Sequence, residues 1–243
     1  MKKYICLLIL LILMLCSGPL LSDTLSTQLL GYWKFDNLVN GKTPDETGNN
    51  DGTIKDIEWV EGKYGQAYQY EGNGTDDSVN LGTPLLSTTD ATQAYTISAW
   101  VKLEVNHNGA GGIVTQYPNS SPSTRFGFRI DNSGHLGWWK GTYNALSSST
   151  INDNTWHHVI GTRSSSGAVQ LYVDGVADGS GTDANAFYNS STYIGHFPSV
   201  DVTFDGTIDE VAIWNRVLTS QEITYIAQNP VLNIPEPGSL ILL

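Results

Sequence analysis

Short segments of alternating apolar and polar residues run through most of this chain, and they restrict its fold more than any other feature. In "VQLYV" (169–173), the three apolar side chains would share one face of a strand, because successive side chains point to opposite faces. Such alternation is typical of antiparallel strands with one buried face. We expect a loop at the Ser-rich residues 147–154, and strands at residues 31–35, 67–70, 77–82, 95–103, 111–117, 125–130, 135–140, 155–163, 168–175, 192–197 and 205–215.

Turns and a single helix complete this pattern. "VDGVA" (173–177) and "SSSG" (164–167) predict hairpin loops, because tight hairpin turns need residues that tolerate positive φ. A helix is expected at residues 218–227, where Thr219 as N-cap and Glu222 three residues later match a capping box. Many strands and one late helix predict an all-β fold, a two-sheet antiparallel jellyroll sandwich with one short C-terminal helix.

The first 22 residues have the layout of a secretory signal peptide. Two lysines precede an apolar run from Ile5 to Leu15, which is too short to favour a membrane-spanning helix, and small residues follow. Both cysteines, Cys6 and Cys16, lie in this segment, so the exported domain would contain no disulfide. Acylation of Cys16 as a lipoprotein is the alternative. Either route predicts a secreted protein, at the cell surface or in the extracellular matrix.

The charge balance is strongly acidic. The chain has 24 Asp and Glu residues against 12 Lys and Arg residues, a net charge of −12. Nucleic acid is therefore not an expected partner, because binding to phosphates relies on Lys and Arg. An acidic surface suits cations or neutral ligands, or it serves solubility alone.

Nine strings of residues occur in the same order as in a known group of domains, and the last of them, "FDGTIDEVAIWNRVLTSQEI", is the longest. They lie at residues 31–36, 45–54, 62–73, 77–82, 95–103, 154–163, 169–176, 193–197 and 204–223. On these strings, residues 29–228 resemble laminin-G-like jellyroll domains of the concanavalin A-like lectin/glucanase superfamily. The resemblance implies two antiparallel sheets packed face to face, with loops along the rims of a concave face.

The C-terminal residues 229–243 form a linker followed by "PEPGSLILL". This string resembles the start of a PEP-CTERM sorting signal, which implies an exosortase as processing partner. The six residues after Pro-Glu-Pro are too few to span a bilayer, and no Arg cluster follows them. The signal is therefore incomplete, either truncated or degenerate, and a chance Pro-Glu-Pro is the alternative.

The pair His157-His158 in "NTWHHV" raises the question of a metal or catalytic site, because histidine is a frequent ligand and general base. On a strand the two rings point to opposite faces and cannot hold one metal together. The other histidines show no zinc-ligand spacing. The pair is therefore interpreted as strand material.

Glycoside hydrolysis would require two carboxyl groups at a defined separation on one face. No Glu-x-Asp-x-(x)-Glu string occurs, and the nearest acidic string, residues 56–62, does not place its acids on one face. In "IDE" (208–210) the neighbouring acids point to opposite faces. A non-enzymatic domain is therefore expected, with a glycoside hydrolase as the less favoured alternative.

Calcium is the cofactor that the sequence supports best. "PDETGNNDG" (44–52) combines oxygen donors and glycines in one tight loop, as a hard cation requires. The resemblance implies a structural Ca²⁺ held by Asp45, Gly48 and Asn50 together with Asp209. The alternative is a solvated turn, with Asp209 accepting hydrogen bonds from backbone amides.

Ligand binding is predicted around "HLGWWKGTYN" (135–144), which contains Trp138, Trp139 and Tyr143. On a strand one tryptophan faces the core and the other faces outward, where with Arg125 it could stack on a sugar ring. Packing of both rings at a sheet edge is the alternative. The sequence thus predicts a non-catalytic recognition domain for carbohydrate or extracellular protein, or else a structural matrix domain without a specific ligand.

Overall fold

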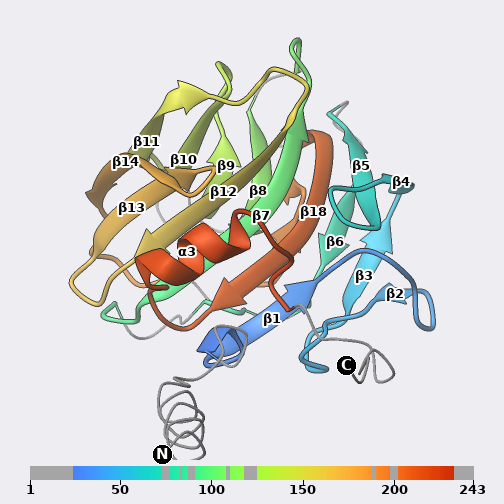
Figure 1. Cartoon of the computed structure of the whole chain (residues 1–243), viewed down its shortest axis with the longest axis horizontal. Helices are drawn as coiled ribbons and strands as arrows, with labels where there is room; N and C mark the ends of the chain where they lie inside the picture. The colour runs from blue at the N-terminus through green and yellow to red at the C-terminus, as the bar shows by residue number, and fades with distance from the viewer. Residues whose placement is uncertain are drawn as a thin grey trace, which may run out of the picture.

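The computed structural model describes residues 24–72, 77–82, 84–86, 91–107, 110–117, 125–187, 190–197 and 202–232 (Figure 1). The predicted signal peptide, residues 1–22, and the predicted sorting signal from residue 233 onward lie outside these ranges. Among the described residues, no helix has the length and apolar character needed to cross a membrane.

Most of the described strands belong to two antiparallel sheets. Sheet A has the order β14 (Val176–Thr182), β13 (Ala168–Val173), β12 (Trp156–Arg163), β7 (Tyr95–Leu103), β18 (Asp205–Trp214), β5 (Gln66–Glu71) and β4 (Glu58–Glu61), and β1 (Leu29–Trp33) also pairs with β18. Sheet B has the order β11 (Tyr143–Thr150), β10 (His135–Trp139), β9 (Phe126–Ile130), β8 (Gly111–Gln116), β15 (Thr192–Ile194), β6 (Ser78–Asn80), β3 (Gly52–Lys55) and β2 (Lys42–Thr43). A separate hairpin joins β16 (His196–Phe197) to β17 (Val202–Thr203).

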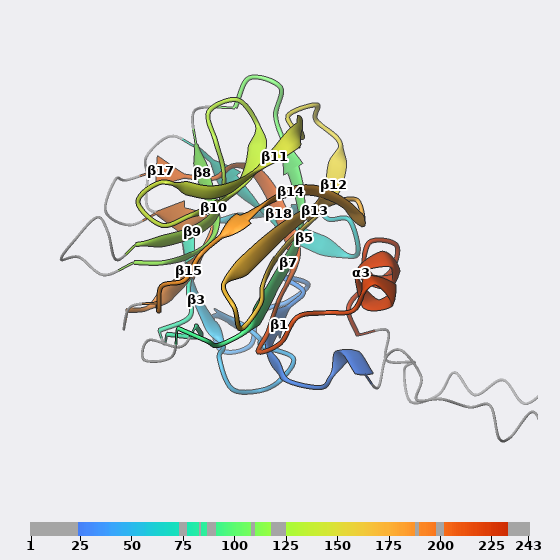
Figure 2. The same ribbon diagram turned by 90° about the vertical axis from the view of Figure 1, so that its left-hand side faces the viewer.

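The two sheets pack face to face around one large apolar core (Figure 2). Alternation along the strands supplies this core: Phe126, Phe128 and Ile130 of β9 and Leu136 and Trp138 of β10 all point inward and are fully or almost fully buried. Their burial from water is the main stabilising contribution in such a sandwich. The all-β two-sheet jellyroll expected from the sequence is thus confirmed.

The helix α3 (Ser220–Ile226) forms a third layer on the outer face of sheet A (Figure 2). Its buried Ile223 and Ile226 pack with Trp214 of β18 and Ile160 of β12 in a second apolar cluster. Thr219 is the N-cap, and its capping box with Glu222 is present as predicted.

The strand β11 contradicts the loop expected at residues 147–154, because it extends to Thr150. Its Ser147 side chain accepts a hydrogen bond from the Leu136 backbone of β10 at 2.9 Å. The pairing partner, rather than the weak strand propensity of a Ser-rich string, decides this segment. The expected strand at 192–197 is divided by Gly195, whose φ is +79°.

Candidate functional site

The candidate site lies on the outer face of sheet B, the face turned away from sheet A. The residues of β9 and β10 that alternate with the core side chains are directed there, among them Arg129 and Trp139. Trp139 is paired with Gly127 in the register of β9 and β10, and Gly137 is paired with Arg129. Large and small side chains therefore alternate across the two strands on this face.

We call the resulting surface the aromatic–arginine face; it consists of Tyr117, Arg125, Arg129, Trp139, Tyr143 and Phe197. The Arg129 guanidinium lies 4.9 Å from the ring centre of Phe197 and 5.5 Å from that of Trp139. The Arg125 guanidinium lies 4.4 Å from the ring of Tyr117. These distances are within the range of cation–π attraction, which holds both guanidinium groups against aromatic rings.

Glycines make room for two of the aromatic rings. A Cβ atom on Gly127 would come within 2.6 Å of the Phe197 ring, and one on Gly137 would come within 2.5 Å of the Tyr143 ring. Both distances are too short for real contacts, so any larger residue would displace the rings. The Phe197 and Trp139 rings then meet edge to face at 5.4 Å between their centres.

The electrostatics of this face are set by its two arginines. The Nε atoms of Arg125 and Arg129 are buried, and among the described residues neither has a hydrogen-bond partner. Burial lowers the pKa of Arg129, and Tyr143, Asp131 and Tyr117 oppose that shift. Asp131 is already engaged, since it accepts hydrogen bonds from the backbones of Ser133 and His135 and pairs with the His135 ring.

The structure unites three of the four residues predicted to bind a ligand. Trp139 and Arg125 are half-buried on the aromatic–arginine face, and Tyr143 is 38 % exposed there. Trp138 is a correction: it is fully buried between the sheets, and its indole Nε1 donates to Asp183 at 3.0 Å. A ligand on the surface cannot reach it, because β10 turns consecutive side chains to opposite faces.

Arg129 and Phe197 were not predicted as members of this face. Arg129 could have been found, because it lies four residues after Arg125 and even spacing keeps both on one side of β9. Phe197 carries no such signal. It reaches the face only because the β16–β17 hairpin packs against β8.

Three of the predicted calcium ligands meet in the early loop. Both oxygens of Asp45 accept hydrogen bonds: the backbone amides of Tyr32, Thr47 and Asn50 donate at 2.9–3.0 Å, and the Asn50 side chain donates at 3.2 Å. Gly48 donates its amide to the Asp45 carbonyl at 2.7 Å. The Thr47 hydroxyl also donates to Asp45, at 2.6 Å, so this carboxylate closes the turn by accepting from both N–H and O–H groups.

Asp209, the fourth predicted ligand, accepts its hydrogen bonds from elsewhere. Its carboxylate receives the backbone amides of Tyr64 at 3.1 Å and Glu210 at 2.8 Å. No group of three or more His, Cys, Asp or Glu side chains suited to a metal ion occurs in the described ranges. Calcium binding by Asp45, Gly48, Asn50 and Asp209 therefore stays a prediction.

The acids Asp209 and Glu210 have unusual pKa values for a physical reason. Burial raises the pKa of Asp209 to about 8 and that of Glu210 to about 7. Raised carboxyl pKa values are a feature of glycosidase acids. Here, however, both residues are at most 2 % exposed, and Glu210 accepts a hydrogen bond from the Tyr32 hydroxyl. Substrate cannot reach carboxyl groups enclosed in this way, so they tie β18 to its neighbours.

The two histidines of "NTWHHV" point apart, as alternation along a strand predicts. The buried His158 contacts Ser98 through Nε2 at 2.9 Å and lies against the Trp100 ring. His157 contacts Asp174 through Nδ1 at 2.8 Å and Asp153 through Nε2 at 3.1 Å. The two rings therefore have separate partners and do not form one site.

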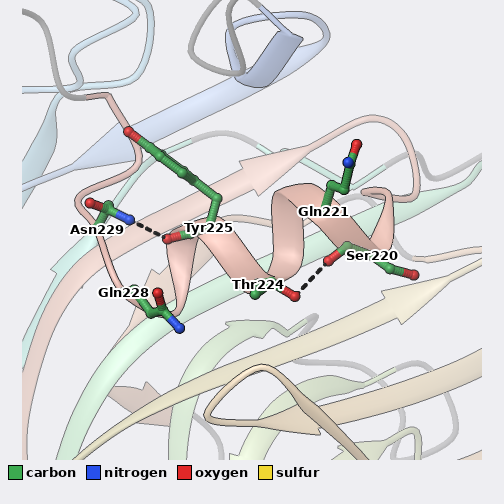
Figure 3. A pocket seen from close by; sticks show the side chains of 6 residues that line it. All are labelled: Ser220, Gln221, Thr224, Tyr225, Gln228 and Asn229. Carbon is green, nitrogen blue, oxygen red and sulfur yellow. Dashed lines mark hydrogen bonds between the residues drawn. The ribbon is translucent and has the colours of Figure 1, made fainter.

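A surface pocket of about 500 Å³ lies along the outer side of α3 (Figure 3). Its lining comes from the helix and the residues that follow it: Ser220, Gln221, Thr224, Tyr225, Gln228 and Asn229. Two of these side chains form hydrogen bonds with the helix backbone: Thr224 donates to the Ser220 carbonyl at 2.9 Å, and Asn229 donates to the Tyr225 carbonyl at 3.0 Å. None of the six carries a charge at neutral pH, in contrast to the aromatic–arginine face.

Comparison with known families agrees with this architecture. Residues 73–224 match the family model Laminin_G_3, described as the concanavalin A-like lectin/glucanases superfamily. The chain belongs to this superfamily. No curated protein sequence matches it.

Several solved structures share the superfamily fold. Domain 4 of AbnA, a GH43 extracellular arabinanase from Geobacillus stearothermophilus in complex with arabinotriose, is 26% identical with a TM-score of 0.63, covering 83% of this chain and 98% of that one. The binding domain of Paraclostridial Mosquitocidal Protein 1 is 18% identical with a TM-score of 0.63, covering 86% and 52%. Trypanosoma rangeli sialidase is 17% identical with a TM-score of 0.64, covering 83% of this chain but only 33% of that one. At these last two identities the likeness concerns the fold alone.

Proposed function

We propose that this chain is a non-catalytic recognition domain that binds carbohydrate on the aromatic–arginine face. The observation that carries the proposal is the grouping of Trp139 and Tyr143 around Arg129, with Arg125 against Tyr117 on the same outer side of sheet B. Aromatic faces pack against the C–H surface of sugar rings, and nearby N–H donors fix their hydroxyl groups. The complex of the arabinanase domain with arabinotriose supports a sugar ligand for a domain of this fold.

The carboxyl groups favour recognition over hydrolysis. The two acids with strongly raised pKa values, Asp209 and Glu210, lie in sheet A and are enclosed by other residues, whereas the sugar-stacking rings lie on sheet B. Export by residues 1–22 would place the domain at the cell surface or in the matrix, with an exosortase processing the C-terminal signal. This location is part of the proposal and rests on the sequence alone.

Binding to a panel of neutral and acidic oligosaccharides, arabinan fragments included, tests this function by calorimetry. We expect Trp139→Ala and Tyr143→Ala each to weaken binding by about tenfold, which corresponds to the loss of one ring contact. Trp59→Ala is the matched control for Trp139→Ala, because Trp59 is 45 % exposed on β4 of the other sheet. Tyr225→Ala is the matched control for Tyr143→Ala, because Tyr225 lines the pocket at α3.

Three results would contradict the proposal. If the wild-type protein binds none of the oligosaccharides in the panel, a structural matrix domain would be favoured. Loss of binding in Tyr225→Ala, with Tyr143→Ala unaffected, would move the site to α3. Turnover of any oligosaccharide by the purified protein would show a glycoside hydrolase instead.

A further inference from the structure

We propose that the aromatic–arginine face selects acidic glycans, whose rings carry carboxylate or sulfate groups. This inference rests on the proposed carbohydrate function and deepens it, because it assigns the ligand class from the two arginines. Arg125 and Arg129 are charge-bearing donors that form no ion pair with a described residue, in a chain whose other charges are mostly negative. Asp131, the acid that acts on Arg129, already accepts hydrogen bonds from Ser133 and His135.

The other two arginines of the chain, Arg163 and Arg216, have oxygen partners, which Arg125 and Arg129 lack among the described residues. The buried Arg163 donates to backbone carbonyls and pairs with Asp183 at 3.6 Å. Arg216 makes a two-pronged ion pair with Glu222 at 2.7 and 2.8 Å. In contrast, Arg125 and Arg129 take part in no ion pair or hydrogen bond with any described residue, and their known neighbours are aromatic rings.

Burial makes this lack of partners significant. A buried N–H group without an acceptor is destabilising, and the Nε atoms of both arginines are in this state. The two terminal nitrogens of a guanidinium fork can give an oxyanion two parallel hydrogen bonds. An anionic group on a ligand would accept from these terminal nitrogens, which are not among the enclosed atoms, while its sugar ring stacks on Trp139 or Tyr143. A neutral sugar offers no equivalent to that paired acceptor.

The two arginines lie against one pair of aromatic rings. The Arg125 guanidinium is 4.4 Å from the ring centre of Tyr117, and the Arg129 guanidinium is 4.9 Å from that of Phe197. The Tyr117 and Phe197 rings are themselves in contact, with 4.8 Å between their centres. The two positive charges thus follow one surface, where an oligosaccharide with several acidic rings offers more anionic groups than a monosaccharide does.

Titration calorimetry on the full-length protein with a matched pair of probes tests this inference. The probes are tetragalacturonate and its methyl ester, which share one backbone and differ in charge. We expect the acid to bind at least about tenfold more tightly than the ester, and galacturonate monomer to bind more weakly than the tetramer. A chondroitin sulfate tetrasaccharide, which carries carboxylate and sulfate groups, forms a further arm. Tighter binding of it than of the desulfated chondroitin tetrasaccharide would support the class and identify sulfate as the anionic group.

Substitutions of the two arginines test whether they are responsible for the preference for acidic glycans. We expect Arg125→Gln and Arg129→Gln each to weaken binding of the acidic tetramer by about tenfold. Lys42→Gln removes the same charge from β2, at the other end of the sheet B order, and should leave binding unchanged. Thermal unfolding confirms that each variant is folded. If Arg129→Gln unfolds, Arg125→Gln decides the question, because its half-buried side chain contacts only Tyr117 among the described rings.

The inference and the proposed function fail in different ways. Equal binding of tetragalacturonate and its ester, or binding of neutral oligosaccharides alone, overturns the selection of acidic glycans and leaves carbohydrate recognition intact. Unchanged affinity in both arginine variants also overturns it. Absence of binding to every acidic and neutral oligosaccharide overturns both.

Discussion

The neighbours His157 and His158 have opposite pKa shifts. Hydrogen bonds from its ring to Asp174 and Asp153 raise the pKa of His157, against an opposing effect of burial. Burial lowers the pKa of His158 to about 3. A histidine pair that looks like a catalytic signature thus consists of one ring that favours the proton and one that excludes it.

The stability of the protein should therefore depend on pH through His158. Its folded-state pKa lies below the unfolded value of about 6.5, so its contribution is complete above that pH and is lost as the pH falls toward 3. Between pH 7.5 and pH 5 the raised pKa values of Asp209, Glu210 and His157 act in the opposite direction, so the effect of His158 is measured as a difference. We expect the free energy of unfolding of His158→Gln, relative to that of the wild type, to increase as the pH falls. Denaturant unfolding of both proteins at the two pH values measures this difference.

The raised pKa of His157 changes the free energy of unfolding with pH in the opposite direction. Its contribution is present below about pH 6.5 and is lost as the pH rises through the folded-state value. An NMR titration should show the His157 ring titrating above pH 6.5 while the His158 ring stays neutral down to acid unfolding. Two rings with coinciding transitions near pH 6.5 would refute this assignment.

At the scale of the element, α3 depends on one carboxylate. Glu222 accepts from the Thr219 backbone at 2.8 Å and from both terminal nitrogens of Arg216. Although its burial opposes the shift, the hydrogen bonds from Arg216 and Thr219 lower the pKa of Glu222 to about 2. The stabilisation is therefore complete above about pH 4.5 and is lost as the pH falls toward 2.

The variant Glu222→Gln should lower the free energy of unfolding by about 1–2 kcal/mol at pH 7, because it weakens the capping box and removes the ion pair. Glu58→Gln on the exposed side of β4 is the control and should change it by less than about 0.5 kcal/mol. Equal effects of the two variants, measured by denaturant unfolding, would show that the capping box contributes nothing specific.

Alternation of apolar and polar residues predicts the central strands better than the edge strands. The strand β7 has the predicted bounds, because nine residues of clear strand character lie between turn residues. The edge strands β4 and β11 were not predicted as strands. Their sequences, "EWVE" and "YNALSSST", carry weak patterns, and pairing with β5 and β10 is what makes them strands.

At the scale of the whole molecule, the Asp45 loop joins β1 to the edge of sheet B. Asp45→Ala would leave the amides of Tyr32, Thr47 and Asn50 without their acceptor. We expect the free energy of unfolding to fall by about 2–3 kcal/mol without added metal. The calcium proposal predicts in addition that millimolar calcium raises the melting temperature of the wild type and that Asp45→Ala abolishes this rise. A melting temperature unchanged by calcium would leave Asp45 as a turn cap alone.

The sequence by itself determined the sandwich, the two hairpin turns, the capped helix and the opposite directions of His157 and His158. These features depend on periodicity and local turn chemistry, which neighbouring residues encode. Only the tertiary structure decided which tryptophan is exposed, where Asp209 finds its hydrogen bonds and how Phe197 joins Arg129. The physical reason is that the phase of a strand is set by its pairing partners and the covering layer, and contacts between distant segments leave no local pattern.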